Sequence, residues 1–378
     1  MLKRDLRRTQ SICIKRWSDV DFEKATATEL NAINMALEEF LDSRIERAKT
    51  MSPSHVQYYE YIKEYIMRGG KRFRPIAVII AYRAVTGKTP PENYYRAACT
   101  VEILHNASLL HDDLIDHDET RRGGPTFHAK YREWYKNKVN PNPDKAAHFG
   151  MTAAILGGDS LMNLGEAAIT ESNLDPDIAV ECHALYEKSF EGLVEGVLLE
   201  MSMISNPNAT TEMYLEMIRM KTAILLEKAL LIGGNLARAS ASQLDALSEF
   251  GVKVGQAFQI QDDILGSFGD EEVTGKAADG DIKEGKKTML VIQAERLCNA
   301  SQRERLSQLL GKDKITDDEV DEVRNLFRNS GALEGAGALM NKLLTEGQKA
   351  LDRANPPFDE TYKKYMLDLS DFLVKRDY

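Results

Sequence analysis

The sequence has few cysteines, and they are widely separated. The chain has 378 residues, and its four cysteines are Cys13, Cys99, Cys182 and Cys298. This spacing fits neither a disulfide framework nor the closely paired ligands of a zinc site. We therefore expect a protein of a reducing compartment, the cytoplasm.

Long apolar runs are also absent. Even the most apolar segment, around AILLEKALLIGGNLA, contains Glu227 and Lys228, whereas a membrane-spanning helix needs about 20 predominantly apolar residues. We expect no integral membrane segment. The N-terminus carries several basic residues but lacks the apolar core of a secretory signal. We expect residues 1–25 to form a basic, flexible leader, with an organelle transit peptide as the alternative.

A net positive charge is lacking as well. The 49 lysines and arginines are outnumbered by 59 acidic residues, so that the formal net charge is −10. This balance argues against a nucleic-acid partner. It does not exclude a small phosphorylated ligand, because a local group of basic side chains is enough to bind one.

Proline is missing from residues 208–355, and no segment keeps the strict alternation of a half-buried strand. The other prolines stand at breaks between amphipathic stretches, and the segment 137–145 is rich in Asn and Pro, which is typical of a loop. These patterns predict an all-α protein. We expect residues 26–378 to form one domain, a single large helical bundle of ten or more helices.

Two sequence patterns predict where individual helices begin and end. Thr26 and Glu29 have the spacing of a capping box, as do Thr316 and Glu319. Gly331 is placed to end the second of these helices, because glycine readily adopts the left-handed backbone conformation found at helix ends.

The first unusual cluster is LLHDDLID, which contains Asp112, Asp113 and Asp116. On a helix, Asp112 and Asp116 lie on the same side one turn apart, and Asp113 is about 100° away. Two carboxylates near 4 Å repel each other by roughly 4 kcal/mol at an effective dielectric constant of about 20. Cations among the oxygens would relieve this repulsion, and Mg²⁺ favours carboxylate, water and phosphate oxygens.

A second acidic cluster favours a metal–diphosphate site over two solvated helix ends. Asp262 and Asp263 end another apolar stretch, and Asp270 follows them. Each cluster is followed by basic residues, which are Arg121, Arg122, Lys276, Lys286 and Lys287. The pattern indicates carboxylates that hold Mg²⁺, a diphosphate bound to Mg²⁺, and cations that neutralise the remaining oxygens.

The segment GGKRFRP, residues 69–75, places three cations within four positions after two glycines. Glycine lets the backbone approach a ligand closely. Alone, the segment would be interpreted as a basic surface loop. Beside two acidic clusters, it indicates a site for a second diphosphate that binds without metal.

These three elements, in this order, resemble the trans-isoprenyl diphosphate synthases. The resemblance covers roughly residues 30–378 and includes GGKRFRP, LHNASLLHDDLID, RRGGPTFH, GGDSL, KTAILLE, FQIQDDILGSFGD, TGK and DIKEGKKT. It implies an all-α bundle around a deep central cavity, a homodimer, and a transferase that joins an allylic diphosphate to isopentenyl diphosphate head to tail.

The resemblance also implies a role for each matching residue. The Mg²⁺ ligands, for about three ions, would be Asp112, Asp113, Asp116, Asp262 and Asp263. The allylic diphosphate would contact Arg121, Lys221, Lys276 and Lys286. Isopentenyl diphosphate would contact Gly70, Lys71, Arg74, His105 and Arg122. Thr222 and Gln259 would face the reacting carbons, and Lys375 and Arg376 would close over the site.

Two positions depart from the family pattern. Gly266 stands where the fuller second aspartate motif has another aspartate. Short-chain members of the family that carry glycine at this position look active, so Gly266 does not indicate an inactive site. The second departure is Val197. The family often has Gly-Gln-x-x-Asp at this place, whereas this chain reads Gly-Val-Leu-Leu-Glu over residues 196–200. The lost amide changes the polar contacts of that wall, but not the reaction class.

Product length depends on what blocks the cavity below Asp112. The fifth and fourth residues before it are Ala107 and Ser108, and members of the family that make C15 products usually carry a bulky aromatic residue at one of these positions. Two small residues leave the tunnel open, and Leu104 and Val101 lie further down the same side of the helix. We expect geranylgeranyl diphosphate (C20), with longer products (C25 or more) or farnesyl diphosphate (C15) as alternatives.

Two other functions compete with the synthase. A class I terpene cyclase shares the first aspartate motif and Mg²⁺, but it has no use for GGKRFRP or for a second aspartate cluster. A non-catalytic partner subunit of a synthase typically loses aspartates, and this chain keeps them at all but one of the expected positions.

Overall fold

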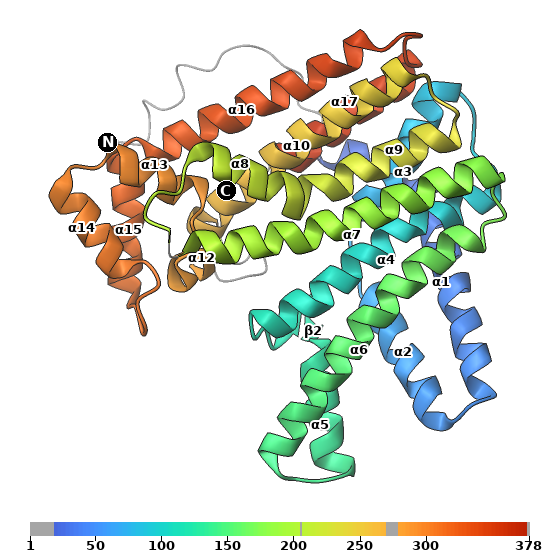
Figure 1. Ribbon diagram of the computed structural model, residues 1–378, viewed down its shortest axis with the longest axis horizontal. Coiled ribbons are helices and arrows are strands. Elements are labelled where there is room, and N and C mark those ends of the chain that lie inside the picture. Colours follow the sequence, from blue (N-terminus) through green and yellow to red (C-terminus); the bar gives the residue numbers. More distant parts are fainter. Residues whose placement is uncertain (1–18, 205, 270–278, 376–378) are drawn as a thin grey trace.

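The computed structural model describes residues 19–204, 206–269 and 279–375, with side chains from Thr26 onward. Asp270, Lys276 and Arg376, three residues named above, lie outside these described residues. The chain is helical nearly throughout, and Figure 1 shows long helices that run side by side. The first helices are α1 (Asp19–Lys49), α2 (Pro53–Met67), α3 (Phe73–Thr86), α4 (Glu92–Ile115), α5 (Phe127–Lys138), α6 (Pro143–Thr170) and α7 (Pro176–Ile204).

The second half continues with shorter helices around one long central helix. These are α8 (Thr211–Ile218), the π-helical turn η1 (Arg219–Ala223), α9 (Ile224–Leu236), α10 (Ala241–Phe268), α12 (Gly280–Glu284), α13 (Met289–Leu297), α14 (Ala300–Leu309), α15 (Asp317–Asn329), α16 (Ala332–Ala350), the 3₁₀ turn η2 (Leu351–Arg353) and α17 (Glu360–Val374). The all-α prediction is confirmed, because α1 to α10 alone reach the expected number of helices.

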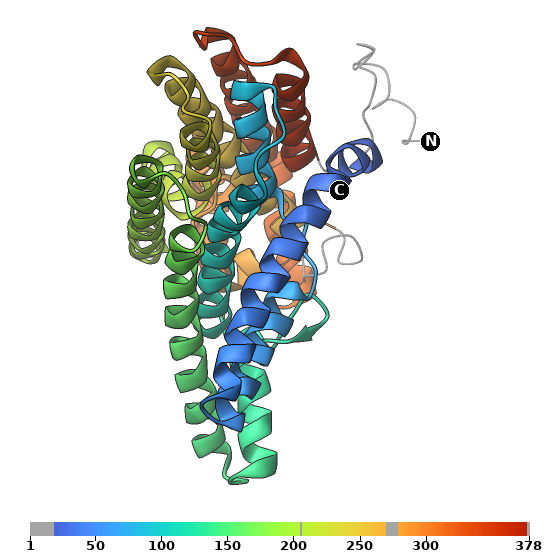
Figure 2. The ribbon, with the colours of Figure 1, turned by 90° about the vertical axis from the view of Figure 1, so that its right-hand side faces the viewer.

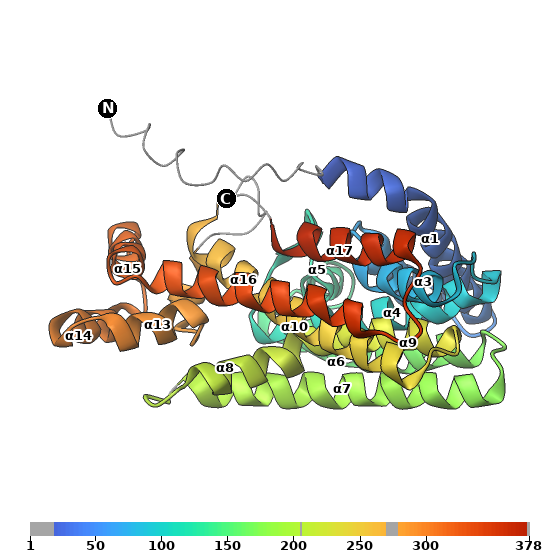
Figure 3. The same cartoon turned by 90° about the horizontal axis from the view of Figure 1, so that it is seen from above.

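The helices form layers around α10. Helix α10 packs against α9 and α16, α3 packs against α9 and α17, and α4 packs against α6. Figure 3 shows α7 and α8 in the lowest layer, α9 and α10 above them, and α16 and α17 on top. Figure 2 shows α5 and the neighbouring end of α6 at the lower end of the molecule, beside the lower ends of α1 and α2, and Tyr61 on α2 packs against Tyr131 on α5. The buried apolar side chains of these layers form one continuous core.

The only strands among the described residues form a small antiparallel hairpin, β1 (Thr120–Arg121) and β2 (Gly124–Pro125). The two residues between them, Arg122 and Gly123, both have positive φ angles, 50° and 71°. Positive φ at both central positions is the requirement of a type I′ turn, which matches the twist of paired strands. This hairpin closely follows α4 and holds the tandem arginines beside the first acidic cluster.

The predicted helix ends had different outcomes. The capping box at Thr316 and Glu319 is confirmed, and Gly331 adopts the left-handed conformation with φ 83° after α15 ends. The capping box at Thr26 is wrong, because α1 begins at Asp19 and Thr26 is a buried position inside the helix. Residues 19–25 of the expected leader are therefore helical. The predicted loop contains the connection between α5 and α6.

Among the described helices, none is both long enough and apolar enough to cross a membrane.

Candidate active site

The first acid pair lies at the C-terminal end of α4, where its two members have different surroundings. Asp112 is partly exposed, whereas Asp113 is fully buried. The Tyr65 hydroxyl on α2 donates a hydrogen bond of 2.7 Å to Oδ2 of Asp113, and Arg121 forms an ion pair with Oδ1. Burial raises the pKa of Asp113, and Arg121 opposes that increase. Both oxygens of Asp113 therefore already have partners within the protein, so we expect any metal contact to come first from Asp112 and Asp116.

The second acid pair, at the end of α10, repeats this arrangement. Asp263 is buried, and its Oδ2 accepts a hydrogen bond of 2.6 Å from the Tyr214 hydroxyl on α8. Its Oδ1 accepts one of 2.9 Å from Nε2 of Gln259. Burial and the nearby charge of Asp281 raise the pKa of Asp263. The other member, Asp262, lies close enough to Arg74, which was expected to bind isopentenyl diphosphate, for its charge to act on the pKa of that guanidinium group.

The π-helical turn η1 directs two adjacent side chains to two different partners. Lys221 Nζ lies 2.6 Å from Oε2 of Glu200 on α7, and the Thr222 hydroxyl donates a hydrogen bond of 2.6 Å to Oε1 of Gln259 on α10. In a regular α-helix, successive side chains point about 100° apart, and a π-turn changes that direction locally. Burial lowers the pKa of Lys221, but Glu200 and Asp112 outweigh it and the pKa is raised.

The first acidic cluster and the basic residues converge near α12. Burial raises the pKa of Asp116, and the charges that oppose this increase belong to Lys286 and Lys221. Burial would lower the pKa of Lys286, but its hydrogen bond to Glu284 and the charge of Asp116 raise it. Residues from α4, from η1 and from the segment after α12 therefore share one electrostatic environment.

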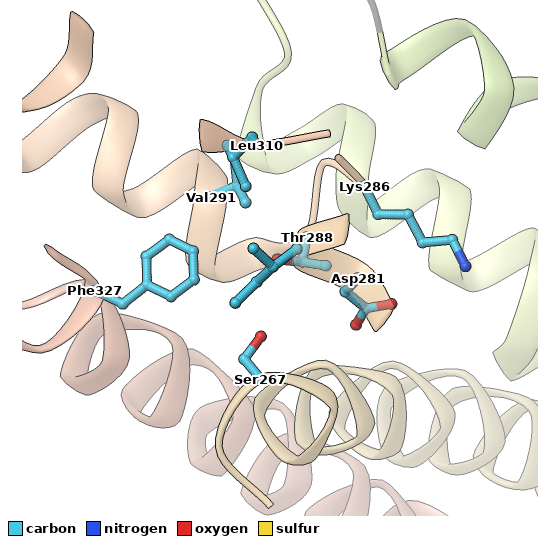
Figure 4. A pocket seen from close by; sticks show the side chains of 8 residues that line it. Ser267, Asp281, Lys286, Thr288, Val291, Leu310 and Phe327 are labelled. Atoms are coloured by element: carbon cyan, nitrogen blue, oxygen red, sulfur yellow. The ribbon is translucent and has the colours of Figure 1, made fainter. Parts of the chain in front are cut away.

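The space beside Gly266 is occupied by an acid from another helix. A Cβ added to Gly266 would stand 2.8 Å from Oδ2 of Asp281, the first acidic residue of α12. Asp281 also lines a narrow hollow between α10, α13 and α15, together with Ser267, Lys286 and Phe327. Figure 4 shows the Asp281 carboxylate and the Lys286 side chain on the same side of this hollow. The missing aspartate thus leaves room for Asp281, which the sequence alone did not single out.

The glycine–arginine segment folds as a tight loop before α3. Gly70 has φ 119°, a conformation that favours glycine. Arg122 lies directly against it, because its Nη1 donates a hydrogen bond of 2.9 Å to the Gly69 carbonyl. Arg72 also lies beside Gly70, since its Nη1 would be 3.1 Å from a Cβ at that position, but the same nitrogen already forms a buried ion pair of 2.7 Å with Glu102. The middle cation of the motif therefore stabilises the fold, and the other two are the candidates for a ligand.

One of these two cations, Arg74, lies among other positive groups. It is buried, and its Nε has no hydrogen-bond partner. Burial lowers its pKa to about 10; Glu102 and Asp262 oppose that decrease, and Arg122 adds to it. Burial and four arginines, Arg74 first among them, hold the pKa of His105 well below its usual range. The expected isopentenyl residues on α3, α4 and the hairpin are thus close together.

The other cation of the loop, Lys71, contacts the C-terminal helix. Its ammonium lies over the ring of Phe372 on α17, 4.3 Å from the centroid. Lys375, which was expected to close over the site, directly follows α17 and forms an ion pair of 2.8 Å with Asp371. Helix α17 therefore lies next to the basic loop, and closure by Lys375 and Arg376 stays a prediction.

The residues expected to limit product length lie on α4, and most of them are on its buried side. Val101, Leu104 and Ala107 are buried, and the Ser108 hydroxyl donates a hydrogen bond of 2.8 Å to the carbonyl of the residue three positions before it. Helix α4 packs against α6. Among these four, only the two small residues lie within two turns of Asp112, and their role in setting product length stays a prediction.

Sequence reasoning missed Tyr65, Tyr214 and Asp281. Each tyrosine is far from its aspartate along the chain, by 48 and 49 residues. A tyrosine inside an apolar helix has no local signal that distinguishes the partner of an aspartate from an ordinary core residue. Asp281 did lie within the quoted motif DIKEGKKT, and that motif is the only signal that could have identified it.

The comparisons with known proteins fit this geometry. The sequence matches the polyprenyl synthetase family over residues 55–327. The chain belongs to the polyprenyl synthetase family. It is therefore a prenyltransferase. It is 33% identical to the short chain isoprenyl diphosphate synthase of Methanocaldococcus jannaschii, with 88% of this chain and 93% of the relative covered. It is 31% identical to the geranylgeranyl diphosphate synthase of Saccharolobus solfataricus, with 92% and 96% covered.

A solved structure supports the same family at the level of the fold. The prenyltransferase superposes on the geranylgeranyl pyrophosphate synthase of Corynebacterium glutamicum with a TM-score of 0.85 and 26% identity. The comparison covers 92% of this chain and 98% of the other. That crystal structure is described as complexed with isoprenyl diphosphate and magnesium. In the part of this chain that the structure describes, no three His, Cys, Asp or Glu side chains form a ready-made metal cluster.

Proposed function

We propose that this prenyltransferase condenses an allylic diphosphate with isopentenyl diphosphate, head to tail, and releases geranylgeranyl diphosphate. The observation that carries the proposal is the pairing of two kinds of site. One side holds the α4 carboxylates of Asp112 and Asp116, with Lys221 and Lys286 near them. The other holds Arg74 and Arg122, whose positive charges oppose each other, together with His105, whose pKa these arginines lower.

The basic group supports a site for an anion that binds without metal. A buried guanidinium normally has partners for its N–H groups, and leaving one unpaired is costly. Arg74 Nε is buried without a partner, and Arg122 adds positive charge beside it. A diphosphate would satisfy the donors and relieve the repulsion at once. Gly70 permits a close approach of the backbone, and Lys71 follows it directly.

The carboxylate donors fit Mg²⁺ as the metal. Asp112, Asp116 and Asp262 offer oxygen ligands from two helices, with Asp113 and Asp263 behind them. Mg²⁺ uses few protein carboxylates and completes its shell with water and substrate phosphate, and about three ions are expected by resemblance. When bound, Mg²⁺ supplies positive charge against the departing diphosphate.

The residues of the chain divide the remaining work. Arg121, Lys221 and Lys286 neutralise charge on the diphosphate of the allylic substrate as its C–O bond breaks, and Lys276 is proposed to join them from outside the described residues. The dipoles of Thr222 and Gln259, which already share a hydrogen bond, stabilise the allylic cation. The isopentenyl double bond attacks that cation. The proton then leaves to the released diphosphate, which is a sufficient base.

Product length is proposed from α4. Ala107 and Ser108 leave space below Asp112, and the buried Leu104 and Val101 stand further along the same helix. Relatives with two product lengths support C20 first and a longer product second. One is the geranylgeranyl diphosphate synthase of Methanosarcina mazei, 31% identical over 85% of this chain and 90% of its own. The other is the geranylfarnesyl diphosphate synthase of Aeropyrum pernix, 32% identical over 82% and 92%.

The test is to incubate the purified chain with isopentenyl diphosphate, Mg²⁺ and each of dimethylallyl, geranyl and farnesyl diphosphate, and to measure products by mass spectrometry. A dominant C20 diphosphate is expected. Leu104→Ala should then shift the products to longer chains, because it removes a buried side chain from the expected floor. Longer products from the wild-type chain would contradict the C20 assignment, and no elongation would favour a non-catalytic partner subunit.

We further propose a homodimer in the cytoplasm. Apolar side chains are exposed along α6 and α7, among them Leu156, Val194, Leu198 and Met201, which are between 45% and 60% exposed. Exposed apolar side chains gathered on neighbouring helices are a frequent mark of a protein interface. Sedimentation analysis of wild type and Leu198→Glu tests the dimer, because a charge in the interface should shift the chain to monomer. Cys99, Cys182 and Cys298 are buried free thiols, which supports a reducing compartment.

A further inference from the structure

Each acid pair is anchored by a tyrosine from a different helix, in the same way. The Tyr65 hydroxyl lies 2.7 Å from Oδ2 of Asp113, and the Tyr214 hydroxyl lies 2.6 Å from Oδ2 of Asp263. Both tyrosines are buried, with 4% and 0% of their surfaces exposed. Hydrogen bonds of this length from a hydroxyl to a carboxylate are among the strong, charge-assisted ones.

The second oxygen of each aspartate contacts another side chain, and we assign that side chain to substrate binding or catalysis. Asp113 Oδ1 forms the ion pair with Arg121. Asp263 Oδ1 accepts a hydrogen bond from Nε2 of Gln259, whose Oε1 accepts one from Thr222. The tyrosine thus occupies one oxygen and leaves the other aimed at a functional side chain. In Gln259, the two contacts also determine which end of the amide faces Thr222.

These contacts restrict the orientation of the buried carboxylates. A buried carboxylate with only one partner would be costly and free to rotate. With both oxygens engaged from different directions, rotation would break two interactions at once.

We propose that Tyr65 and Tyr214 are matched positioning residues of the prenyl transfer site. Tyr65 orients Arg121 through Asp113, and Tyr214 orients Gln259 through Asp263. The proposal rests on the proposed function for what those residues touch. We call each series of contacts a relay. The first relay ends on Arg121, which we assign to the leaving diphosphate, and the second ends on Gln259 and Thr222, which we assign to the reacting carbons. The two tyrosines should therefore affect different kinetic constants.

The experiment compares Tyr65→Phe and Tyr214→Phe with the control Tyr95→Phe. Tyr95 on α4 also donates a 2.7 Å hydrogen bond to a carboxylate on another helix, Oε2 of Glu29 on α1, but it takes no part in either relay. Each variant removes one hydroxyl that binds a carboxylate. Y65F should raise KM for the allylic diphosphate by about tenfold, and Y214F should lower kcat by about tenfold, the size of one charged hydrogen bond. Y95F should change neither constant.

A second readout does not depend on turnover. Inorganic diphosphate with Mg²⁺ should raise the melting temperature of the wild-type chain, because a ligand that binds only the folded state stabilises it. The Mg²⁺ concentration that gives half of this shift should increase in Y65F and Y214F and remain unchanged in Y95F. If the wild type shows this shift but no condensation, the proposed function fails and the tyrosine proposal is still tested.

A double-mutant cycle separates positioning from simple loss of stability. If Tyr65 acts through Asp113 on Arg121, Tyr65→Phe should cost little more in an Arg121→Lys background than Arg121→Lys alone, and likewise for Tyr214→Phe with Thr222→Val. Additive losses in both cycles would overturn the proposal. So would wild-type kinetics and wild-type Mg²⁺ dependence in both tyrosine variants, and so would an equal effect of Y95F.

Discussion

The backbone of Gly196 on α7 lies directly against the backbone of Lys221, so that a Cβ on Gly196 would stand 2.8 Å from the Lys221 Cα. One turn further along α7, Glu200 receives the Lys221 ammonium. This close approach brings the π-helical turn η1 within reach of α7. The glycine therefore matters for the placement of a side chain that we assign to the leaving diphosphate.

Gly196→Ala should lower activity more than stability alone explains. The methyl group meets backbone atoms that cannot move aside locally, so α7 and η1 must separate, at a cost of about 1–3 kcal/mol. Thermal unfolding and kcat test this. The control is Gly337→Ala on α16, where an added Cβ meets nothing within 4 Å. That variant should be stabilised by about 0.5–1 kcal/mol, with unchanged kcat. Equal kcat in the two variants would contradict the prediction.

Gly266→Ala should separate activity from stability in another way. Its Cβ would meet a flexible carboxylate, Oδ2 of Asp281 at 2.8 Å, rather than backbone. The carboxylate can move aside, and alanine is favoured over glycine in a helix, so we expect a change in stability of less than about 1 kcal/mol. Moving Asp281 disturbs the charges around Lys286 and Asp263, so kcat should fall severalfold. Unchanged kcat would show that the place of Asp281 is not important for turnover.

Phe372→Leu should affect one substrate only. The ring of Phe372 supports the Lys71 ammonium at 4.3 Å from its centroid, and a cation–π contact of this kind contributes about 0.5–2 kcal/mol. Without the ring, the Lys71 side chain adopts more orientations in the free protein, so that fixing it on the ligand costs more entropy. KM for isopentenyl diphosphate should rise about threefold to tenfold, while KM for the allylic diphosphate stays constant. Phe372→Tyr keeps a ring and should restore the wild-type value. A parallel rise for both substrates would indicate general damage.

His105 should make the folded chain less stable in mild acid. Its pKa in the folded state is well below the ordinary value because of burial and the surrounding arginines. The unfolded chain therefore binds the proton first, and stability falls as the pH decreases below about 6.5. The loss approaches roughly 1.4 kcal/mol per pH unit until the folded pKa is reached. Urea unfolding at several pH values should show this slope, and His105→Gln should reduce it. Identical slopes would contradict the assignment.

The sequence predicted those features that depend on local chemistry. Helix periodicity, the capping box at Thr316 and the left-handed Gly331 involve residues within a few positions of one another, so the interactions that decide them are contained in a short segment. The same logic failed at Thr26, because α1 extends through that position and buries its side chain. A capping pattern competes with tertiary packing, and at Thr26 the packing prevailed.

The sequence predicted which residues belong to the candidate site. Only the structure shows which partners these residues contact. The acid pairs, the tandem arginines and GGKRFRP are visible as patterns because their charges are too concentrated for an ordinary surface. Their partners are not visible. Arg72 pairs with Glu102, and Asp281 occupies the space beside Gly266. Nothing local distinguishes Arg72 from Arg74, which are two positions apart.

By itself, the sequence determined an all-helical chain with two acidic helix ends, a basic glycine loop and the chemistry that these groups can perform. The tertiary structure decided which oxygen of each buried aspartate is used and by which partner. Tyr65 and Tyr214 reach their aspartates from 48 and 49 residues away along the chain. The physical reason is that charge and periodicity are written in neighbouring residues, whereas the pairing of buried polar groups depends on how whole helices pack against each other.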